Sequence, residues 1–339
     1  MLKTSLINID TAKSIITNKK LGLFQEVFWW KIIESGFGKP CKVALISKGG
    51  VNQLLIPLFF HRIGFVNRVG SPLRGTFTPY IEFLKLAEDI TIEAQNECLE
   101  DLINTLIKDG ANWIEITNLV NQDEKNNNLN GLGFSSEFAS SILLATDKKE
   151  ADLWEGMQGR SRNLVRKAEK NGLSVRYNEY NLGTIDLFYS MLSVTFSKSG
   201  QKPPHSKAFY KLLIKDLLKS NNVIFLSVEK EREVLAMGIF NFNDSEINFV
   251  SGTSKKIGNQ FGANNLMHWE VIKFASRNKL LSYNFGGLGL PSIDKFKRSF
   301  GGIEIKYQRH IWMTPLVRFI FGFFMMIKKV ILSIRLRRK

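Results

Sequence analysis

Alternating apolar and polar positions divide the first part of the chain into short elements. Residues 24–35 form a candidate helix. Two strand-like runs, 42–47 and 53–60, flank the pair Gly49-Gly50, and this arrangement predicts a β-hairpin. Further along, the expected elements are a helix at 91–108 and a strand at 112–117.

The pattern after residue 146 predicts a longer series of elements. A long helix is expected from 151 to 171, and Gly172 suits its C-terminal end. After it we expect helices at 185–196 and 206–219, strands at 223–228, 234–243 and 247–252, a helix at 263–277, and strands at 281–285 and 303–312. This order indicates a mixed α/β fold. The first part has a shorter version of the same order, so two copies of one fold are expected.

The chain is therefore expected to have three parts: a first domain at 1–145, a second at 146–313 and a tail at 314–339. The tail has seven basic residues and no acidic one. Its apolar run, 319–327, is well short of the roughly 20 residues that cross a bilayer. Basic charge with bulky aromatic side chains is typical of an amphipathic helix on an anionic membrane surface. The alternative is a C-terminal helix packed on the protein's own core.

Composition narrows the classes of partner. The formal net charge is +16, which favours anionic partners such as nucleic acid, phosphorylated cofactors, nucleotide-linked sugars or acidic lipid. The two cysteines, Cys41 and Cys98, lie far apart and the four histidines are scattered. We therefore expect neither a disulfide framework nor a metal site. Residues 1–20 have no apolar core of signal-peptide length, so a cytoplasmic location is expected.

A basic stripe follows one face of the first helix of the second domain. Arg162, Arg166 and Lys170 are spaced at i, i+4 and i+8, and Arg160 and Lys167 add to them. Arginine binds phosphate in a bidentate manner, so this stripe is a candidate phosphate site. The alternative is a solvated helix face.

Two further features lie at the helix expected from residue 263. Gly258 and Gly262 precede it, and glycines there let backbone N–H groups approach a phosphate. The alternative is an ordinary glycine-rich connection. Glu270 stands within an apolar face of the same helix, where burial would raise its pKa toward that of a general base. The alternative is a structural ion pair.

Charged residues also follow the strand at 281–285. Pro291 suits the first turn of a short helix, and Phe296 and Phe300 at i, i+4 would pack inward. Lys297 and Arg298 would then point elsewhere, just past the strand's end, where ligands of α/β proteins often sit. Solvated lysines on an amphipathic turn are the alternative.

Several motifs together resemble one family. Residues 162–173 (RNLVRKAEKNGL) and 296–301 (FKRSFG) resemble the two conserved motifs of FemAB-like and CelD-like members of the GNAT superfamily. Between them, 204–213, with His205 and Tyr210, and 234–238 are also similar to the family. Near the start, the Trp29-Trp30 pair and the loop 72–80 extend the resemblance to roughly residues 24–312.

The resemblance implies two GNAT-like domains with mixed sheets and transfer of an acyl group to an amine or hydroxyl. It places the family lysine at Lys297, as a group that stabilises the transferred carbonyl or binds phosphate. Glu270 or Asp294 would be the base, directly or through water. The residues expected to bind phosphate or substrate are Arg162, Arg166, Lys167, His205, Tyr210, Gly258, Gly262, Tyr283 and Arg298.

Three functions are compatible with this resemblance. The first is acyl transfer from acyl-CoA to a nucleotide- or lipid-linked sugar precursor of the cell envelope or of an exopolysaccharide, on the inner face of the membrane. The second is aminoacyl transfer from aminoacyl-tRNA to a peptidoglycan precursor. The third is a non-catalytic protein that binds RNA or lipid through its basic face. No nucleic-acid-binding motif is present, which disfavours a dedicated RNA binder.

Overall fold

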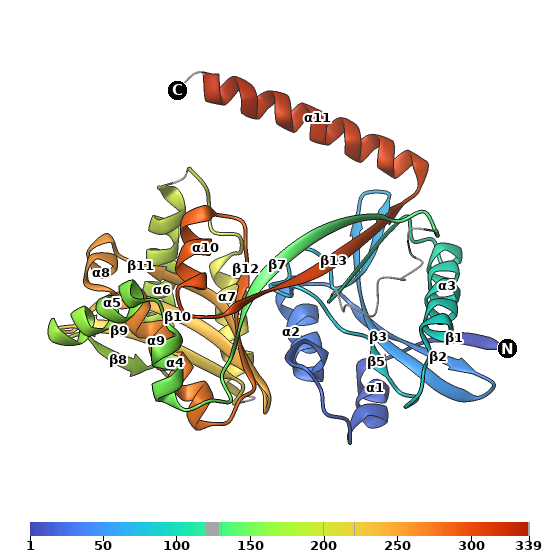
Figure 1. Ribbon diagram of the computed structural model, residues 1–339. Coiled ribbons are helices and arrows are strands. Elements are labelled where there is room, and N and C mark those ends of the chain that lie inside the picture. The colour runs from blue at the N-terminus through green and yellow to red at the C-terminus, as the bar shows by residue number, and fades with distance from the viewer. Residues whose placement is uncertain (120–128, 130, 199, 220, 338–339) are drawn as a thin grey trace. The chain divides into compact units, whose positions relative to one another are not determined.

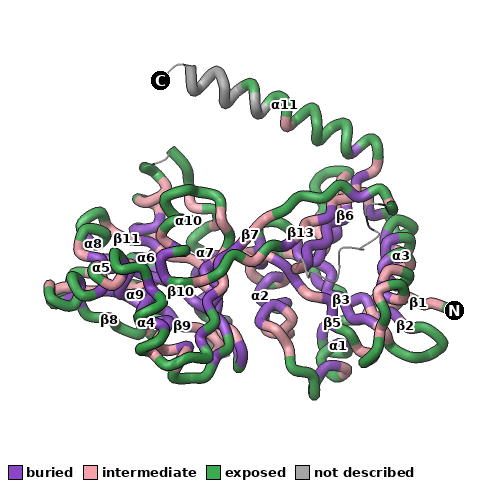
Figure 2. The backbone as a smooth tube through the Cα atoms, viewed as in Figure 1, coloured by how far each residue is buried: buried purple, intermediate pink, exposed green. Residues whose placement is uncertain are grey.

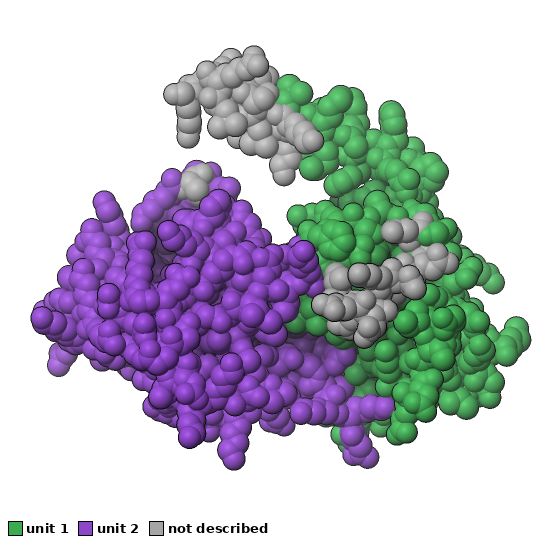
Figure 3. Space-filling view, in the orientation of Figure 1, with its two compact units in different colours: residues 1–17, 39–138, 307–339 green, residues 18–38, 139–306 purple. Residues whose placement is uncertain are grey.

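The computed structural model describes residues 1–119, 129, 131–198, 200–219 and 221–337. The chain forms two compact units, coloured separately in Figure 3. Unit 1 comprises residues 1–17, 39–138 and 307–339, and unit 2 comprises residues 18–38 and 139–306. Each unit is thus assembled from segments that are distant in the sequence.

Unit 1 is a sheet covered by one long helix (Figure 1). Its strands run in the order β1-β2-β3-β4-β6-β13, and only β4 and β6 are parallel. Helix α3 packs its apolar face against the sheet through Cys98, Leu99 and Leu102. The elements are β1 (Leu2–Ile7), α1 (Ile9–Ile16), β2 (Cys41–Lys48), β3 (Val51–Ile63), β4 (Val66–Ser71), β5 (Leu84–Lys85), α3 (Ile92–Lys108), β6 (Trp113–Leu119), β13 (Ile303–Met313, from residue 307 on) and α11 (Pro315–Arg337).

Unit 2 has the strand order β7-β12-β11-β10-β9-β8, in which only β11 and β12 are parallel. Its core joins α5 and α9 to the sheet through Val165, Val271 and Phe240. The elements are η1 (Leu23–Gln25), α2 (Val27–Phe37), β7 (Ser135–Ala145, from residue 139 on, its first residues belonging to unit 1), α4 (Glu150–Gly156), α5 (Gly159–Lys170), β8 (Ser174–Tyr177), α6 (Leu182–Ser197), α7 (Lys207–Lys219), β9 (Val223–Lys230), β10 (Glu233–Phe242), β11 (Glu246–Ser254), α8 (Lys256–Phe261), α9 (Ala263–Arg277), β12 (Ser282–Gly287) and α10 (Pro291–Arg298).

The strands of the two units share one topology. In each, four antiparallel strands in chain order are followed by a helix and a parallel strand, and an antiparallel strand completes the sheet. The helix and parallel strand are α3 and β6 in unit 1, and α9 and β12 in unit 2. The completing strand is β13 in unit 1 and β7 in unit 2. The same arrangement thus occurs twice along the chain.

The composition of the units differs from the consecutive boundaries expected from the sequence. Residues 18–38 lie in unit 2, where the Phe37 ring packs 4.5 Å from that of Phe209 on α7. Residues 307–313 lie in unit 1, because β13 pairs with β6 from Tyr307↔Leu119 to Met313↔Trp113. Strand pairing and aromatic packing decide both assignments, and neither leaves a local signal in the chain.

The long helix expected at 151–171 is broken into α4 and α5. Met157 and Gln158 have extended backbones, with ψ of 147° and 141°. The break lets residue 301 approach so closely that a Cβ there would lie 2.5 Å from the Gly156 carbonyl oxygen. Gly301 therefore packs its backbone directly on the end of α4.

Helix α11 is exposed over most of the length whose side chains are described (Figure 2). Val317 is buried, and the Phe321 ring lies 4.9 Å from that of Trp113. Phe319, Phe323 and Phe324 are 73%, 55% and 61% exposed. Among the described residues, no helix combines the length and apolarity that crossing a membrane requires.

Candidate active site

The parallel strands β11 and β12 of unit 2 stay paired over only three residue pairs. They pair from Glu246↔Ser282 to Asn248↔Asn284. On its other side β12 pairs with β7, and that pairing resumes at Gly287↔Ser141 after the pairing with β11 has ended. Beyond Asn248, β11 continues beside β10 alone. Divergence of parallel strands at their carboxyl ends opens a space in the sheet, which is where α/β proteins bind ligands.

A cavity of about 460 Å³ lies in unit 2 beside the diverging part of β11. Elements α6, β11, α8, α9 and α10 contribute to its wall. The lining residues are Thr195, Phe249, Gly252, Thr253, Ser254, Asn259, Asn264, Asn265, Met267, His268, Ser292, Ile293, Phe296 and Lys297. Amides, hydroxyls and aromatic rings predominate, and Lys297 is the single charged residue among them.

Lys297 reaches the cavity from the end of α10. Its Nζ donates a hydrogen bond of 2.6 Å to the Gly287 carbonyl oxygen, at the end of β12. The residue is 8% exposed. Burial lowers the pKa of the Lys297 ammonium to about 8, although the Asp294 charge acts in the opposite direction. The amphipathic-turn alternative, with a solvated lysine, therefore does not describe this residue.

Local sequence explains the position of Lys297. Pro291 begins α10, and Asp294 accepts hydrogen bonds from the backbone N–H groups of Gly289 and Leu290. Phe300 is fully buried, as the i, i+4 spacing from Phe296 predicts. Lys297 follows Phe296 on the same helix, and its side chain lines the cavity.

A buried histidine–tyrosine pair lies beside this lysine. His268 Nδ1 is 2.6 Å from the Tyr283 hydroxyl, and both residues are buried. Burial, with a smaller contribution from the Lys297 charge, lowers the pKa of His268 to about 3. His268 is therefore neutral near pH 7, and it forms an uncharged wall of the cavity. Burial also raises the pKa of Tyr283.

Amide and hydroxyl groups connect the elements around the cavity. Asn264 Nδ2 donates to Ser254 Oγ at 3.1 Å and to Asn259 Oδ1 at 3.0 Å. The hydroxyls of Thr195 and Thr253 are 2.8 Å apart and link α6 to β11. These contacts hold the wall in place before any ligand binds.

The two carboxylates expected as a base are not both near Lys297. Asp294 lies one helical turn before it and accepts hydrogen bonds from the backbone N–H groups of Gly289 and Leu290 at the start of α10. Glu270 is held instead by Lys273 at 2.7 Å and by the Tyr177 hydroxyl at 3.3 Å. Because Glu270 follows His268 by two residues, it lies on a different face of α9 from the cavity wall. Glu270 thus forms the structural ion pair that the sequence offered as the alternative.

The basic stripe of α5 does not line the cavity. Arg162 pairs with Glu155, and the Arg166 guanidinium lies 5.2 Å from the centre of the Trp154 ring. Lys167 is exposed. Arg298 is exposed as well and pairs with Glu304 at 2.6 Å. These cations form part of the surface of unit 2.

Gly258 and Gly262 are explained by close packing. Residues 256–261 form the helix α8, where an open connection was expected. A Cβ at residue 258 would lie 2.6 Å from the Leu235 carbonyl oxygen, and one at residue 262 would lie 2.3 Å from that of Leu164. Gly262 also has φ of +83°. Glycine is needed at both positions for backbone contact with neighbouring elements.

His205 and Tyr210 lie in an aromatic cluster of unit 2, away from the cavity lining. The His205 ring is 4.6 Å from that of Phe209, and burial lowers its pKa. Tyr210 is fully buried against Phe188 at 5.5 Å, and burial raises its pKa. The structure thus places Asp294 near Lys297 and Tyr283 against His268 of the cavity wall, whereas His205 and Tyr210 belong to this separate cluster.

Sequence reasoning missed Asn264, Asn265 and His268 as parts of the cavity wall. Asn264 and His268 are at i, i+4, and Asn265 and His268 are at i, i+3, so they share a face of α9. This polar face in an otherwise apolar helix was the available signal. It was overlooked because Glu270 was the most polar residue of the segment.

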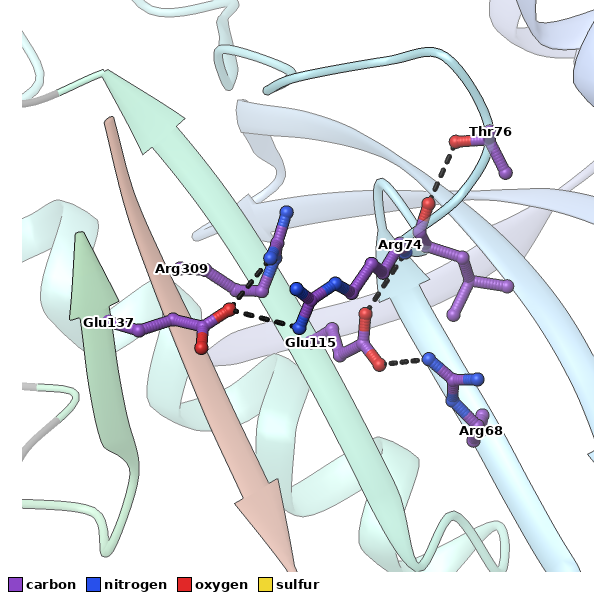
Figure 4. A network of polar contacts seen from close by, with 7 residues as sticks. Arg68, Arg74, Thr76, Glu115, Glu137 and Arg309 are labelled. Atoms are coloured by element: carbon purple, nitrogen blue, oxygen red, sulfur yellow. Dashed lines mark hydrogen bonds and ion pairs between the residues drawn. The ribbon is translucent and has the colours of Figure 1, made fainter. Parts of the chain in front are cut away.

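The loop 72–80 of unit 1 is fixed by a separate polar network (Figure 4). Glu115 pairs with Arg68 and accepts a hydrogen bond from the Arg74 backbone N–H at 3.1 Å. Glu137 binds Arg309 at 2.7 Å and Arg74 at 3.5 Å. Two carboxylates thus bind three arginines, and the loop is held against β6, β7 and β13.

The part of the chain that forms the cavity matches a known protein family. Residues 157–298, within unit 2, match the family described as the acetyltransferase (GNAT) domain. A sequence search of curated proteins gave no match.

Among the described residues, no group of three histidine, cysteine or acidic side chains is placed to hold a metal ion.

Several solved structures share the fold of the whole chain. The crystal structure of FemX has a TM-score of 0.72 at 15% identity, covering 94% of this chain and 99% of that one. A tandem GNAT protein from the clavulanic acid biosynthesis pathway has 0.59 at 7% identity, covering 92% and 98%. L-PGS from Bacillus licheniformis has 0.54 at 9% identity, covering 89% and 90%.

The chain therefore has a tandem GNAT-like mixed α/β fold. As expected, residues 157–298 resemble the GNAT acetyltransferase domain, and the chain shares its fold with FemX. The match to an acetyltransferase domain confirms the expected enzyme class, an acyltransferase.

Proposed function

We propose that the protein transfers an acyl group from acyl-CoA to an amine or hydroxyl of a cell-envelope or exopolysaccharide precursor, at the cavity of unit 2. The observation that carries this proposal is the buried Lys297 ammonium at the divergence of β11 and β12. A lone cation in a partly apolar cavity acts on a developing negative charge more strongly than it would in water.

The chemistry requires little beyond this cation and a positioned donor. The acceptor attacks the acyl carbonyl, and negative charge develops on the carbonyl oxygen. Lys297, with a pKa of about 8, is mostly protonated at pH 7 and stabilises that oxygen. The bond to sulfur then breaks, and the proton lost by the acceptor ends on the departing thiolate. His268 stays neutral and leaves Lys297 as the only charge at the wall.

A base can assist without lying in the cavity. Asp294 remains our proposed base, acting through water, because its charge already influences Lys297. Glu270 is a weaker candidate for the base than Asp294, because its carboxylate is paired with Lys273. Proton transfer to the leaving group needs neither carboxylate.

Aminoacyl-tRNA is the second candidate donor, with a peptidoglycan precursor as acceptor. The exposed cations of α5, together with the net charge of +16, favour a polyanion near unit 2. In that case Arg162, Arg166 and Lys167 would contact phosphates, and binding would weaken steeply with salt. A non-catalytic RNA- or lipid-binding protein, the third candidate, would release neither CoA nor tRNA on turnover.

We also propose that α11 lies on an anionic membrane surface and brings the enzyme to a lipid-linked precursor on the inner face. Val317 and Phe321 contact unit 1, whereas Phe319, Phe323 and Phe324 are exposed. The tail 314–339 has seven basic residues and no acidic residue, which complements anionic lipid.

Ligand-induced thermal stabilisation tests the donor. A donor at about 100 times its Kd adds about 2.7 kcal/mol to the free energy of unfolding. Acetyl-CoA, palmitoyl-CoA and aminoacyl-tRNA are to be compared at fixed salt. A shift with an acyl-CoA supports the first candidate, a shift only with tRNA supports the second, and no shift with any of them argues against both.

A further inference from the structure

One amide in the cavity wall lacks a partner in the protein. Asn265, on the first turn of α9, is 5% exposed, and its Nδ2 has no hydrogen-bond partner. A buried N–H group without a protein partner is costly, and a water molecule or a ligand is the kind of partner that satisfies it. Because Asn265 lines the same cavity as Lys297, the missing partner is expected inside that cavity.

The neighbouring residue provides a direct contrast. Asn264 also lines the cavity, but its Nδ2 donates to Ser254 and Asn259. The protein thus uses the amide of Asn264 to join α9 to β11 and α8. It makes no comparable use of the Asn265 amide, so a structural role explains one asparagine and not the other.

The surroundings indicate which ligand atom the amide binds. Phe249, Met267 and Phe296 supply apolar surface to the wall, and among the described lining residues only Lys297 is charged. A phosphate would require more cations than this wall offers. A neutral N–H donor beside apolar groups suits an uncharged acceptor, such as the carbonyl oxygen of a thioester, ester or amide.

We propose that Asn265 Nδ2 donates a hydrogen bond to a carbonyl oxygen of the acyl donor. The inference rests on the proposed function, since it assumes that the donor occupies this cavity. Asn265 is then a substrate-contacting residue that orients the acyl chain, while Lys297 stabilises the charge that develops during transfer. The unpaired N–H group of this amide costs stability in the free enzyme, and it gains an acceptor when the acyl donor binds.

Two alanine variants test this assignment, with Asn264→Ala as the matched control. Asn265→Ala removes an unpaired donor, so its melting temperature is expected to be no lower than that of the wild type. Asn264→Ala removes internal hydrogen bonds and is expected to lower the melting temperature by about 2–4 °C. Calorimetry with acetyl-CoA, palmitoyl-CoA and aminoacyl-tRNA identifies the probe that binds the wild type.

Asn265→Ala is expected to bind that probe roughly 3- to 10-fold more weakly, whereas Asn265→Ser, which retains a donor, recovers part of the loss. A lower melting temperature with unchanged probe affinity would overturn the proposal, because Asn265 would then be structural. If no probe binds the wild type, the proposed function fails. The melting comparison then still decides whether Asn265 carries an unused donor.

Discussion

Lys297 Nζ lies 2.6 Å from the Gly287 carbonyl oxygen, which joins the end of α10 to the end of β12. A single neutral acceptor holds the ammonium without neutralising it. The ammonium therefore keeps its charge for a substrate, and burial lowers its pKa to about 8. This combination of a fixed position and an uncompensated charge is the basis of the proposed mechanism.

The pH dependence of transfer should report Lys297. If the protonated amine stabilises the developing oxyanion, kcat falls as the pH rises through about 8. Lys297→Arg keeps a charge at all accessible pH values. We therefore expect this variant to lose the decline near pH 8, whatever its absolute rate. A decline that is the same in both proteins would assign it to another group.

The same shift affects stability. The folded-state pKa of Lys297, about 8, lies below its ordinary value of 10.5, so the unfolded chain binds more protons between these values. The free energy of unfolding should therefore rise with pH across this window, by about 3 kcal/mol at most. Urea titrations of the wild type and Lys297→Met measure it. The variant is expected to show a smaller rise, and an identical rise would contradict the shift.

Acidification should destabilise unit 2 through His268. Its folded-state pKa is about 3, below the ordinary value of 6.5, so stability is present above pH 6.5 and is lost as the pH falls toward 3. The full effect is about 4–5 kcal/mol. His268→Gln should flatten the acid side of the stability profile. A variant as acid-sensitive as the wild type would show that other groups dominate.

Gly262→Ala should strongly destabilise the protein. The substitution places a Cβ 2.3 Å from the Leu164 carbonyl oxygen and forces alanine to a φ of +83°. We expect a loss of about 2–5 kcal/mol. Gly172→Ala is the matched control, because Gly172 has φ of +74° but open space around it. The control should lose only about 1–2 kcal/mol. Equal losses in the two variants would mean that α5 moves away and relieves the contact with the new Cβ at residue 262, so that only the backbone strain remains.

Vesicle binding tests α11. Replacing Phe319, Phe323 and Phe324 with serine should abolish flotation with anionic vesicles, because these rings supply the exposed apolar surface. Phe65→Ser, at an exposed phenylalanine of the β3–β4 turn, should not change it. Retained flotation of the triple variant, or equal flotation of the wild type with zwitterionic vesicles, would contradict the proposed orientation.

Much of this fold was predictable, and the exceptions have physical causes. The spacing of Phe296 and Phe300 predicts the short helix α10 and the burial of Phe300, since helical periodicity is local. Strand β7, early in the chain, completes the strand order of unit 2, and β13, late in the chain, completes that of unit 1. This depends on pairing between distant segments, which local patterns do not record. The break after Gly156 accompanies the close approach of Gly301, a contact between positions far apart in the sequence that local patterns do not record.

The site was predictable only in part for a similar reason. A carboxylate in an apolar segment makes Glu270 conspicuous in the sequence, but tertiary packing decides which face of α9 meets the cavity, and Glu270 pairs with Lys273 instead. His268 and Asn265 face the cavity, and their polar character was less conspicuous in the sequence.

The most direct test of the central claim is acyl transfer by Lys297→Ala. Radiolabelled acetyl-CoA or palmitoyl-CoA is incubated with a cell-envelope precursor fraction, and label in the acceptor is measured. The wild type should transfer label, and the variant should be slower by about 100- to 1000-fold while remaining folded by circular dichroism. Wild-type transfer by a folded Lys297→Ala protein would contradict the account.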